Sequence, residues 1–238
     1  MSQLEGQIAL ITGASRGIGA ATAKALAARG AHVILSARDD RALQAIEQEI
    51  FDKGGSATIA PVDLAESDGI ARLSAAIAGR WPALDMLVIN AAAFPALGPV
   101  VSIDQREFNR TLTLNVLSTQ ALLAGFDPLL RKSAAGRVVG LTTSVATKPR
   151  AYFGAYAASK AAFEALLDAY ALETKNLSRL RVAIVDPGAT RTRMREKAYP
   201  GEDPANVKPP EVVAEALADL LADGAWETGL RMRVPEPA

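Results

Sequence analysis

Short apolar runs alternate with longer amphipathic stretches along the whole chain. The short runs are rich in β-branched residues, which predicts strands, and the longer stretches carry apolar residues at helical spacing, which predicts helices. The predicted strands are Ile8–Thr12, His32–Ala37, Ala57–Pro61, Met86–Asn90, Arg137–Thr143, Arg181–Asp186 and Leu230–Val234. The predicted helices are Ile18–Arg29, Arg41–Lys53, Ser67–Arg80, Asp104–Leu130, Ala155–Asn176 and Glu211–Ala222. Such alternation, with strands apolar almost throughout, is typical of a parallel sheet covered by helices on both faces.

The pattern therefore predicts an α/β fold with a doubly wound sheet of seven parallel strands. No linker, repeat or low-complexity tract interrupts the alternation, so we expect residues 1–238 to form a single domain. The only long irregular segment is expected over residues 186–209, which are rich in proline, glycine and charge. Irregular segments of this length in compact domains are usually functional or mobile. We expect residues 186–209 to form a lid over a binding site.

Composition narrows the classes of function. The chain has 26 basic and 26 acidic residues and a formal net charge of zero, which argues against nucleic-acid or anionic-membrane partners. It has no cysteine and one histidine, His32, so we expect neither disulfides nor a transition-metal site. No apolar stretch reaches membrane-spanning length, and the N-terminus has no signal-peptide pattern. We expect a cytoplasmic protein that binds neither nucleic acid nor membranes.

A glycine-rich turn lies between the first predicted strand and the first predicted helix. It reads Thr12-Gly13-Ala14-Ser15-Arg16-Gly17-Ile18-Gly19. Glycines allow backbone N–H groups to approach phosphate oxygens, and the positive end of the helix dipole favours negative charge. A glycine-rich turn alone is also compatible with an ordinary loop, but the strand–turn–helix context indicates a dinucleotide pyrophosphate site.

A second group of polar residues lies in the middle of the chain. Tyr156 and Lys160 are four residues apart and therefore share one helix face. Ser144 follows the fifth predicted strand, at the sheet edge where doubly wound folds bind ligands. Asn115 lies inside an apolar helical stretch, where asparagine is unfavourable because its amide competes for backbone hydrogen bonds. Asn115 is either part of a site or a satisfied buried amide.

Together these residues resemble the short-chain dehydrogenase/reductase family over nearly the whole chain. The family's T-G-x-x-x-G-x-G motif is matched by the Thr12–Gly19 turn, and its Asn–Ser–Tyr–Lys tetrad falls on Asn115, Ser144, Tyr156 and Lys160. The resemblance implies a Rossmann fold and these four catalytic residues. The chain departs from the family's N-N-A-G motif, of which only Asn90 and Ala91 are kept, and from the family's glycine-rich ending. Residues 198–204, with Lys208 and Pro209 that follow, look like those of a bacterial branch of oxidoreductases.

The resemblance also implies the cofactor contacts. An aspartate after the third strand meets adenine in the family, and a P-G-x-x-x-T segment faces the nicotinamide. The expected cofactor-binding residues are Gly13, Ser15, Arg16, Gly17, Ile18, Gly19, Arg38, Asp63, Leu64, Asn90, Tyr156, Lys160, Pro187, Gly188, Thr190 and Thr192.

The tetrad implies proton transfer coupled to hydride transfer. An unperturbed tyrosine has a pKa near 10, so Tyr156 needs a nearby positive charge to act as a base at neutral pH. We expect the Lys160 ammonium, together with a cationic nicotinamide, to lower that pKa and Tyr156 to act as general acid or base. Ser144 would bind the substrate oxygen, Lys160 the nicotinamide ribose, and Asn115 a water that links Lys160 to solvent.

The end of the second strand predicts the choice of cofactor. NAD-dependent relatives carry an acid there that binds the ribose hydroxyls. The chain has Ala37 at this position, followed by Arg38, and Arg16 lies in the glycine turn. Two guanidinium groups suit a 2′-phosphate, so we expect NADP(H) rather than NAD(H). We interpret the acidic pair Asp39–Asp40 as the cap of the next helix.

The resulting hypothesis is an NADP-dependent oxidoreductase acting on a small carbonyl compound or secondary alcohol. The alternatives are a reductase of 3-oxoacyl groups on a carrier, and a catalytically silent nucleotide-binding sensor or scaffold. Helices 104–130 and 155–176 form the family's dimer interface, so we expect a homodimer or homotetramer. Four basic residues of the expected lid either attract an acidic substrate or form a solvated loop face. They are Arg191, Arg193, Arg195 and Lys197. Tyr152 and Phe153 either line the substrate pocket or pack against the protein.

Overall fold

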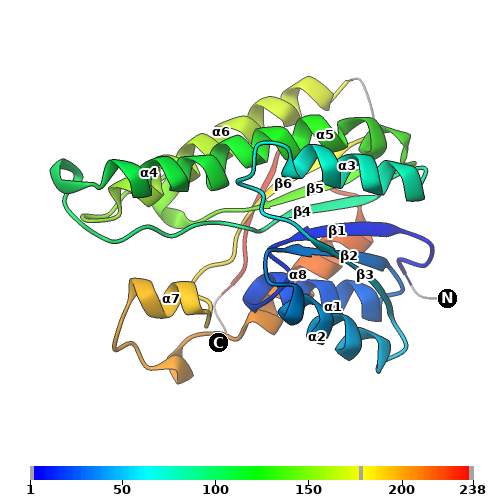
Figure 1. Ribbon diagram of the computed structural model, residues 1–238, viewed down its shortest axis with the longest axis horizontal. Coiled ribbons are helices and arrows are strands. Elements are labelled where there is room, and N and C mark those ends of the chain that lie inside the picture. Colours follow the sequence, from blue (N-terminus) through cyan, green and yellow to red (C-terminus); the bar gives the residue numbers. More distant parts are fainter. Residues whose placement is uncertain (1–2, 177–178, 236–238) are drawn as a thin grey trace.

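Seven strands form one parallel sheet in the order β3-β2-β1-β4-β5-β6-β7 (Figure 1). The computed structural model describes residues 3–176 and 179–235. Every predicted strand is present, with each end within two residues of its predicted position, which confirms the fold prediction. The strands are β1 Ile8–Thr12, β2 His32–Ala37, β3 Ser56–Pro61, β4 Met86–Ile89, β5 Arg137–Leu141, β6 Arg181–Asp186 and β7 Leu230–Arg233.

Helices cover both faces of the sheet because successive strand residues point to opposite sides. On one face Ile11, Val88 and Val185 pack with residues of α1, α2 and α8 (Figure 1). On the other face Leu10 and Leu87 pack with residues of α3, α5 and α6. The helices are α1 Gly17–Ala28, α2 Asp40–Phe51, α3 Gly69–Arg80, α4 Gln105–Leu112, α5 Ser118–Lys132, α6 Gly154–Thr174, α7 Arg193–Ala198 and α8 Pro210–Asp223.

The predicted helix Asp104–Leu130 is interrupted in the structure. A π-helical turn, Thr113–Leu117, separates α4 from α5. The wider turn frees carbonyl groups from the α-helical ladder, and neighbouring hydroxyls satisfy them. Thr119 Oγ1 donates to the Asn115 carbonyl at 3.0 Å, and Ser118 Oγ donates to the Leu114 carbonyl at 2.5 Å. The interruption therefore lies at Asn115, the residue whose presence in this helix was unfavourable.

The segment that we expect to form a lid, residues 186–209 (the lid segment), is less irregular than expected. It contains α7, whose first turn is capped by the Thr192 hydroxyl accepting from the Arg195 N–H at 3.2 Å. A short 3₁₀ turn, Pro204–Asn206, and a bridge between Thr190 and Lys208 follow. The prediction that this is the only long irregular segment is also wrong, because residues 90–99 after β4 form no regular element. The Ala93 backbone in that segment is held by hydrogen bonds to the Asn115 side chain, which the linear pattern does not show.

Candidate active site

The glycine turn after β1 has the backbone that a phosphate cradle requires. Gly13 and Gly17 have φ angles of +67° and +56°, which residues with a Cβ adopt at a cost. A Cβ on Gly19 would lie 2.3 Å from the Gly13 carbonyl oxygen and 2.5 Å from Asn90 Nδ2. Only glycine fits at residue 19, so the start of α1 stays close to the turn. The N-terminal N–H groups of α1 therefore lie beside the open turn.

Thr12 and Asn90 hold this turn against the end of β4. Thr12 Oγ1 accepts from the Asn90 and Ala91 N–H groups at 3.0 and 3.1 Å. Asn90 Nδ2 donates to the carbonyls of Thr12 and Gly13 at 2.9 and 3.2 Å. The Asn90 amide nitrogen is thus committed to the turn, and its evident role is to position the predicted phosphate cradle.

The ends of β2 and β3 bring Arg38 and Asp63 together. Arg38 is 58% exposed, and its guanidinium lies 3.8 Å from an Asp63 carboxylate oxygen. The Asp39 side chain accepts from the Ala42 N–H at 3.1 Å and caps α2, as its position in the sequence predicted. Arg16, also exposed, immediately precedes α1. No carboxylate of the Asp39–Asp40 pair lies within ion-pair distance of Arg38 in the described chain.

Lys160 points into the protein from α6. Its ammonium donates to the Leu141 carbonyl at 2.7 Å and lies 4.2 Å from the Phe163 ring centre. The residue is only 3% exposed, and burial lowers the pKa of Lys160 to about 8, against an opposing effect of the nearby Glu164 carboxylate. Glu164 is itself buried and accepts from Thr142 Oγ1 at 2.5 Å.

Tyr156 lies one helical turn before Lys160 and is also buried. Its hydroxyl lies 3.6 Å from the Met194 sulfur in α7, and its ring meets the Phe94 ring edge-on at 4.9 Å. Burial raises the pKa of Tyr156 above its usual value, and the Asp186 carboxylate adds to the rise. The sequence predicted a lowered pKa for Tyr156. The Lys160 ammonium instead donates to the Leu141 carbonyl, and burial of the Tyr156 phenol has the largest effect on its pKa.

Ser144 and Asn115 approach α6 from two other elements. Ser144 begins the 3₁₀ turn η3, Ser144–Ala146, which packs against α6. Asn115 is 1% exposed, and its amide is saturated: Oδ1 accepts from the Ala93 N–H at 2.7 Å, and Nδ2 donates to the Ala93 carbonyl and to Ser159 Oγ, each at 3.0 Å. These contacts match the satisfied buried amide, and they hold Asn115 against Ser159, the residue before Lys160 in α6.

The first part of the lid segment carries the other predicted cofactor residues. Gly188 has a φ of +67°, and its N–H donates to Asp186 Oδ1 at 2.9 Å. Thr190 is buried and donates to the Pro187 carbonyl at 3.2 Å, while Thr192 caps α7. The Pro187–Thr192 stretch thus crosses the carboxyl end of β6 with its backbone fixed by its own side chains.

Several residues at the site carried no recognisable sequence signal. Phe94 and Met194 are single apolar residues in segments without periodicity, and only the fold brings them to Tyr156. Lys208 is buried, and its ammonium donates to the carbonyls of Val234 and Pro235 at 3.0 Å each. This lysine ties the end of the lid segment to the chain after β7.

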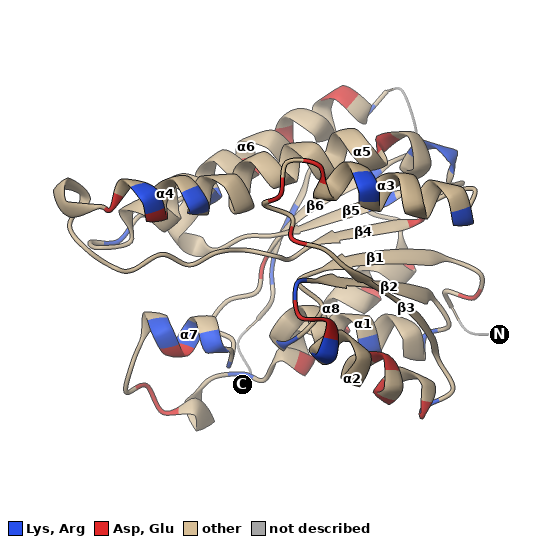
Figure 2. Cartoon of the chain, viewed as in Figure 1, with Lys and Arg blue, Asp and Glu red and all other residues tan. Residues whose placement is uncertain are grey.

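The basic residues of α7 do not all face solvent freely. Figure 2 shows basic residues on α7 with an acidic residue between them. Arg195 pairs with both oxygens of Glu202 at 2.6 Å and stacks on the Tyr199 ring at 3.7 Å. Arg195 is therefore occupied within the lid segment, which argues against it as a receptor for an acidic substrate.

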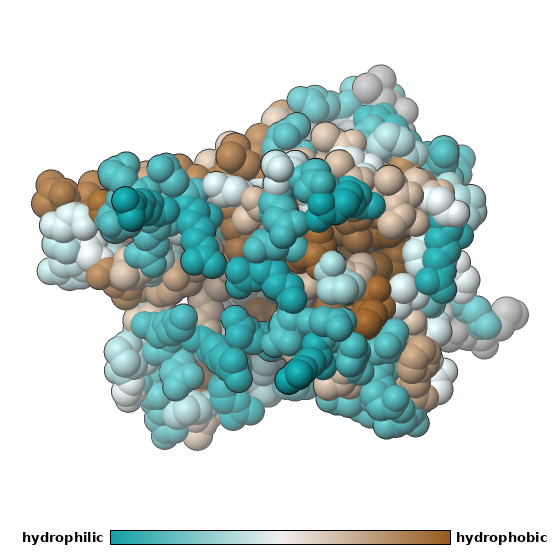
Figure 3. All heavy atoms as spheres, in the orientation of Figure 1, coloured by the Kyte–Doolittle hydropathy of each residue, from teal (hydrophilic) through white to brown (hydrophobic). Residues whose placement is uncertain are grey.

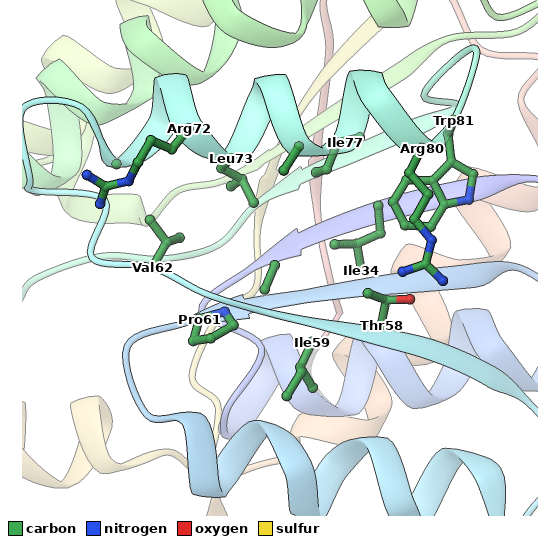
Figure 4. A pocket seen from close by; sticks show the side chains of 13 residues that line it. Ile34, Thr58, Ile59, Pro61, Val62, Arg72, Leu73, Ile77, Arg80 and Trp81 are labelled. Carbon is green, nitrogen blue, oxygen red and sulfur yellow. The ribbon is translucent and has the colours of Figure 1, made fainter.

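An apolar hollow of about 360 Å³ lies elsewhere, between α3 and β3 (Figure 4). Figure 3 shows hydrophobic residues gathered there, on the right of the view. Leu73 and Ile77 reach into it from α3 and face Ile34 and Val62. None of the predicted site residues lines this hollow, so it is separate from the Tyr156 region.

Within the described residues, 3–176 and 179–235, no cluster of three or more histidine, aspartate or glutamate side chains could hold a metal ion. No helix there has both the length and the apolar character that crossing a bilayer requires.

A parallel doubly wound sheet, a glycine cradle and a buried Tyr–Lys pair define a dinucleotide-dependent oxidoreductase. The chain belongs to the short chain dehydrogenase family, which matches residues 7–203. An uncharacterized oxidoreductase of Escherichia coli K12, YciK, is 35% identical over 223 residues, covering 92% of this chain and 88% of that protein. The crystal structure of E. coli YciK superposes with a TM-score of 0.93 at 34% identity, covering 99% of this chain and 97% of that one.

Two other solved structures of similar proteins contain a nicotinamide cofactor. A short chain dehydrogenase from E. coli CFT073 in complex with NADPH has a TM-score of 0.93 at 35% identity, with 99% of each chain covered. One from Shigella flexneri 2a in complex with NADP has the same TM-score at 34% identity, with 98% of each chain covered. These comparisons confirm the predicted family, fold class and enzyme class, and they agree with the predicted nicotinamide cofactor. The cytoplasmic location and the homodimer or homotetramer stay predictions.

Proposed function

We propose that the chain is an NADP-dependent oxidoreductase that interconverts a carbonyl compound and its secondary alcohol, with Tyr156 as the general acid or base. The observation that carries this proposal is the pair of buried groups on one face of α6. The Tyr156 hydroxyl opens toward the lid segment, and the Lys160 ammonium lies one turn behind it. Within the described residues, this buried ammonium contacts one carbonyl and one ring and feels the nearby Glu164 carboxylate without forming an ion pair, so a chemical role explains it better than a stabilising one.

The residues at the sheet edge fit a nicotinamide dinucleotide phosphate. A Cβ would clash with neighbouring atoms at Gly13 and Gly19, and glycine there lets a ligand approach the backbone N–H groups of the turn. This suits a pyrophosphate. Arg38 and Arg16 would hold a 2′-phosphate. The Arg38–Asp63 pair is long and exposed, so it contributes little and yields readily to a phosphate. Asp63 would then border the adenine and Lys160 the nicotinamide ribose. When bound, the nicotinamide supplies or accepts a hydride.

The side chains around α6 would handle the proton. Tyr156 donates its hydroxyl proton to the substrate oxygen in reduction and takes it back in oxidation. Ser144, held on η3 against α6, would donate a second hydrogen bond to that oxygen and orient the carbonyl. Because burial raises the pKa of Tyr156, the protein alone keeps the phenol protonated. The protonated phenol is the form that Tyr156 needs at the start of a reduction.

The lid segment would exclude water from this site. Met194 covers the Tyr156 hydroxyl, and Val207 and Lys208 are buried at the other end of the segment. Excluding water strengthens hydrogen bonds to the reacting oxygen. We propose residues 186–209 as a lid in a single-domain enzyme.

The test is NADPH oxidation with a panel of ketones and aldehydes by purified protein. We expect Tyr156→Phe to lower kcat by about 10²–10⁴-fold while NADPH still binds, as followed by its fluorescence. Tyr170→Phe is the matched control, since Tyr170 lies on the same helix and donates to Asp127 at 2.7 Å, away from the site. Near-normal turnover by Tyr156→Phe would refute the proposed role, and no turnover of any carbonyl by the NADPH-bound wild type would refute the proposed function.

We also propose that the chain is at least a homodimer. Leu117 and Leu172, on the elements that carry the family's interface, are 61% and 74% exposed. A second subunit that packs on these elements would cover both leucines. Light scattering should give at least twice the monomer mass, and Leu172→Glu should shift the protein toward monomer. A wild type that stays monomeric at micromolar concentration would contradict this proposal.

A further inference from the structure

The Tyr156 hydroxyl has only one proton to donate, and a side chain of the lid segment already receives it. The acceptor is the Met194 sulfur at 3.6 Å. A thioether is a weak acceptor, so this bond is easily exchanged for one to a carbonyl oxygen. If Tyr156 protonates a substrate, the substrate oxygen must lie about 2.7 Å from the same hydroxyl. The hydroxyl therefore cannot donate its proton to Met194 and to the substrate at the same time.

Apolar side chains form one part of the surroundings of Met194. Phe94 meets the Tyr156 ring at 4.9 Å and the Phe153 ring at 6.0 Å, both edge-on. Val145 belongs to the same cluster, in which Met194 is partly buried. None of these side chains offers a charge or a second strong hydrogen-bonding group. A ligand that replaces Met194 thus gains aromatic and aliphatic contacts around its carbonyl group.

Side chains at the two ends of α7 are held with different strength. At its C-terminal end the Tyr199 hydroxyl accepts from Arg150 at 2.7 Å, and its ring faces Phe153 at 6.0 Å. Arg195 also stacks on that ring at 3.7 Å. At the N-terminal end the Thr192 cap holds the backbone, but the Met194 side chain makes one weak sulfur hydrogen bond and apolar contacts. The easy movement is therefore a change in the Met194 side chain while the backbone and Tyr199 stay in place.

We propose that Met194 occupies the substrate's seat in the free protein and is the residue that selects substrates by size. The chamber takes carbonyl compounds whose neighbouring group is apolar, and this group displaces the Met194 side chain. The inference rests on the proposed function, since it assumes that Tyr156 serves a carbonyl oxygen. It adds the substrate class and names the residue that excludes larger members of that class.

Steady-state kinetics on ketones of graded size test the selection. The probes are 2-butanone, acetophenone and 2-acetylnaphthalene with NADPH. We expect Met194→Ala to raise kcat/KM for 2-acetylnaphthalene relative to 2-butanone by about tenfold or more, which is the usual effect of apolar volume in a pocket. Met194→Leu keeps the volume and should keep the wild-type ratio. Glu196→Gln, an exposed change on α7, is the control for the helix itself.

A second measurement follows Met194 without turnover. The chain has four methionines, so protein labelled with ¹³C at the methionine methyl groups gives a simple spectrum, in which Met194→Leu identifies the Met194 signal. Adding 1-phenylethanol to the NADPH-bound protein forms a complex that cannot react, because both ligands are reduced. We expect the Met194 signal to shift as it leaves the Tyr156 and Phe94 rings, and the Met86 signal in the buried core to stay unchanged.

The outcomes separate the inference from the proposed function. Active wild type with an unchanged size ratio in Met194→Ala would overturn the inference and leave the proposed function standing. A Met194 signal that does not move at saturating 1-phenylethanol would overturn it as well. If the NADPH-bound wild type reduces no carbonyl compound, the proposed function fails, and the inference falls with it.

Discussion

Replacing Lys160 by methionine should reveal what its buried charge costs the folded protein. Burial lowers the pKa of Lys160 from 10.5 to about 8. That difference corresponds to about 3 kcal/mol by which the folded state disfavours the charged lysine. The residue is 3% exposed, so solvent screening reduces this figure little. At neutral pH, below both pKa values, the whole penalty acts on the folded protein.

The Lys160→Met variant keeps most of the side-chain length and removes the charge. It loses the 2.7 Å hydrogen bond to the Leu141 carbonyl, which costs about 1–2 kcal/mol because the carbonyl is left without its partner. It also loses the contact with the Phe163 ring, which costs about 1 kcal/mol. Set against the relief of about 3 kcal/mol, we expect the cofactor-free variant to equal or slightly exceed the wild type in free energy of unfolding at pH 7. We expect its turnover and its NADPH affinity to fall.

The pH dependence gives the sharper measurement. Between the folded pKa of about 8 and the unfolded value of 10.5, the unfolded chain binds more protons, so wild-type stability rises with pH. The variant lacks this contribution, and all other groups titrate alike in both proteins. From pH 7 to about pH 9.5, the wild type should gain about 2 kcal/mol relative to Lys160→Met in urea denaturation. A difference between the two proteins that stays constant over this range would refute the buried, charged state of Lys160.

Three further predictions concern other parts of the proposed site. Ala37→Asp combined with Arg38→Leu should shift the ratio of kcat/KM for NADPH over NADH toward NADH by at least tenfold, and tighter binding of NADH by the unmodified protein would contradict the cofactor assignment. Gly19→Ala should abolish cofactor binding or folding, as measured by NADPH fluorescence and circular dichroism, because its Cβ would lie 2.3 Å from the Gly13 carbonyl oxygen. Residues 188–208 should exchange amide hydrogens faster than the central strands in the ligand-free protein, and equal protection would argue against a lid.

The inner strands were predictable because a parallel sheet covered on both faces requires apolar residues at nearly every position of such strands. Every residue of β4 and β5, for example, is buried, and both strands read as continuous apolar runs apart from Arg137 and Gly140. The break between α4 and α5 was not predictable from the same reasoning. It depends on contacts of Asn115 with Ala93, a residue in a segment without a periodic pattern.

The residues of the candidate site likewise fall into those that the sequence could predict and those that it could not. The four-residue spacing of Tyr156 and Lys160 is a local property of the sequence, and the family resemblance singled this pair out. The Arg38–Asp63 contact depends on the pairing of β2 with β3, and the family resemblance supplied that neighbourhood. Met194 and Phe94 meet Tyr156 across more than thirty residues of chain each, and neither belongs to a motif, so only the fold could reveal them.

Contact strength varies across the site in a way that matches the proposed function. The contacts that fix the framework are short and buried, such as Lys160 to Leu141 at 2.7 Å and Asn115 to Ala93 at 2.7 Å. The contacts at the positions where ligands would sit are long or involve a weak acceptor: Arg38 to Asp63 at 3.8 Å, and Tyr156 to the Met194 sulfur at 3.6 Å. A ligand that replaces the long or weak contacts loses little binding free energy. A ligand that had to break the framework contacts would lose several kcal/mol, about 1–3 for each buried group left unpaired. In the free protein the Arg38 guanidinium and the Tyr156 hydroxyl thus make only weak contacts within the protein. A ligand that bonds to them therefore keeps most of the free energy of its own contacts.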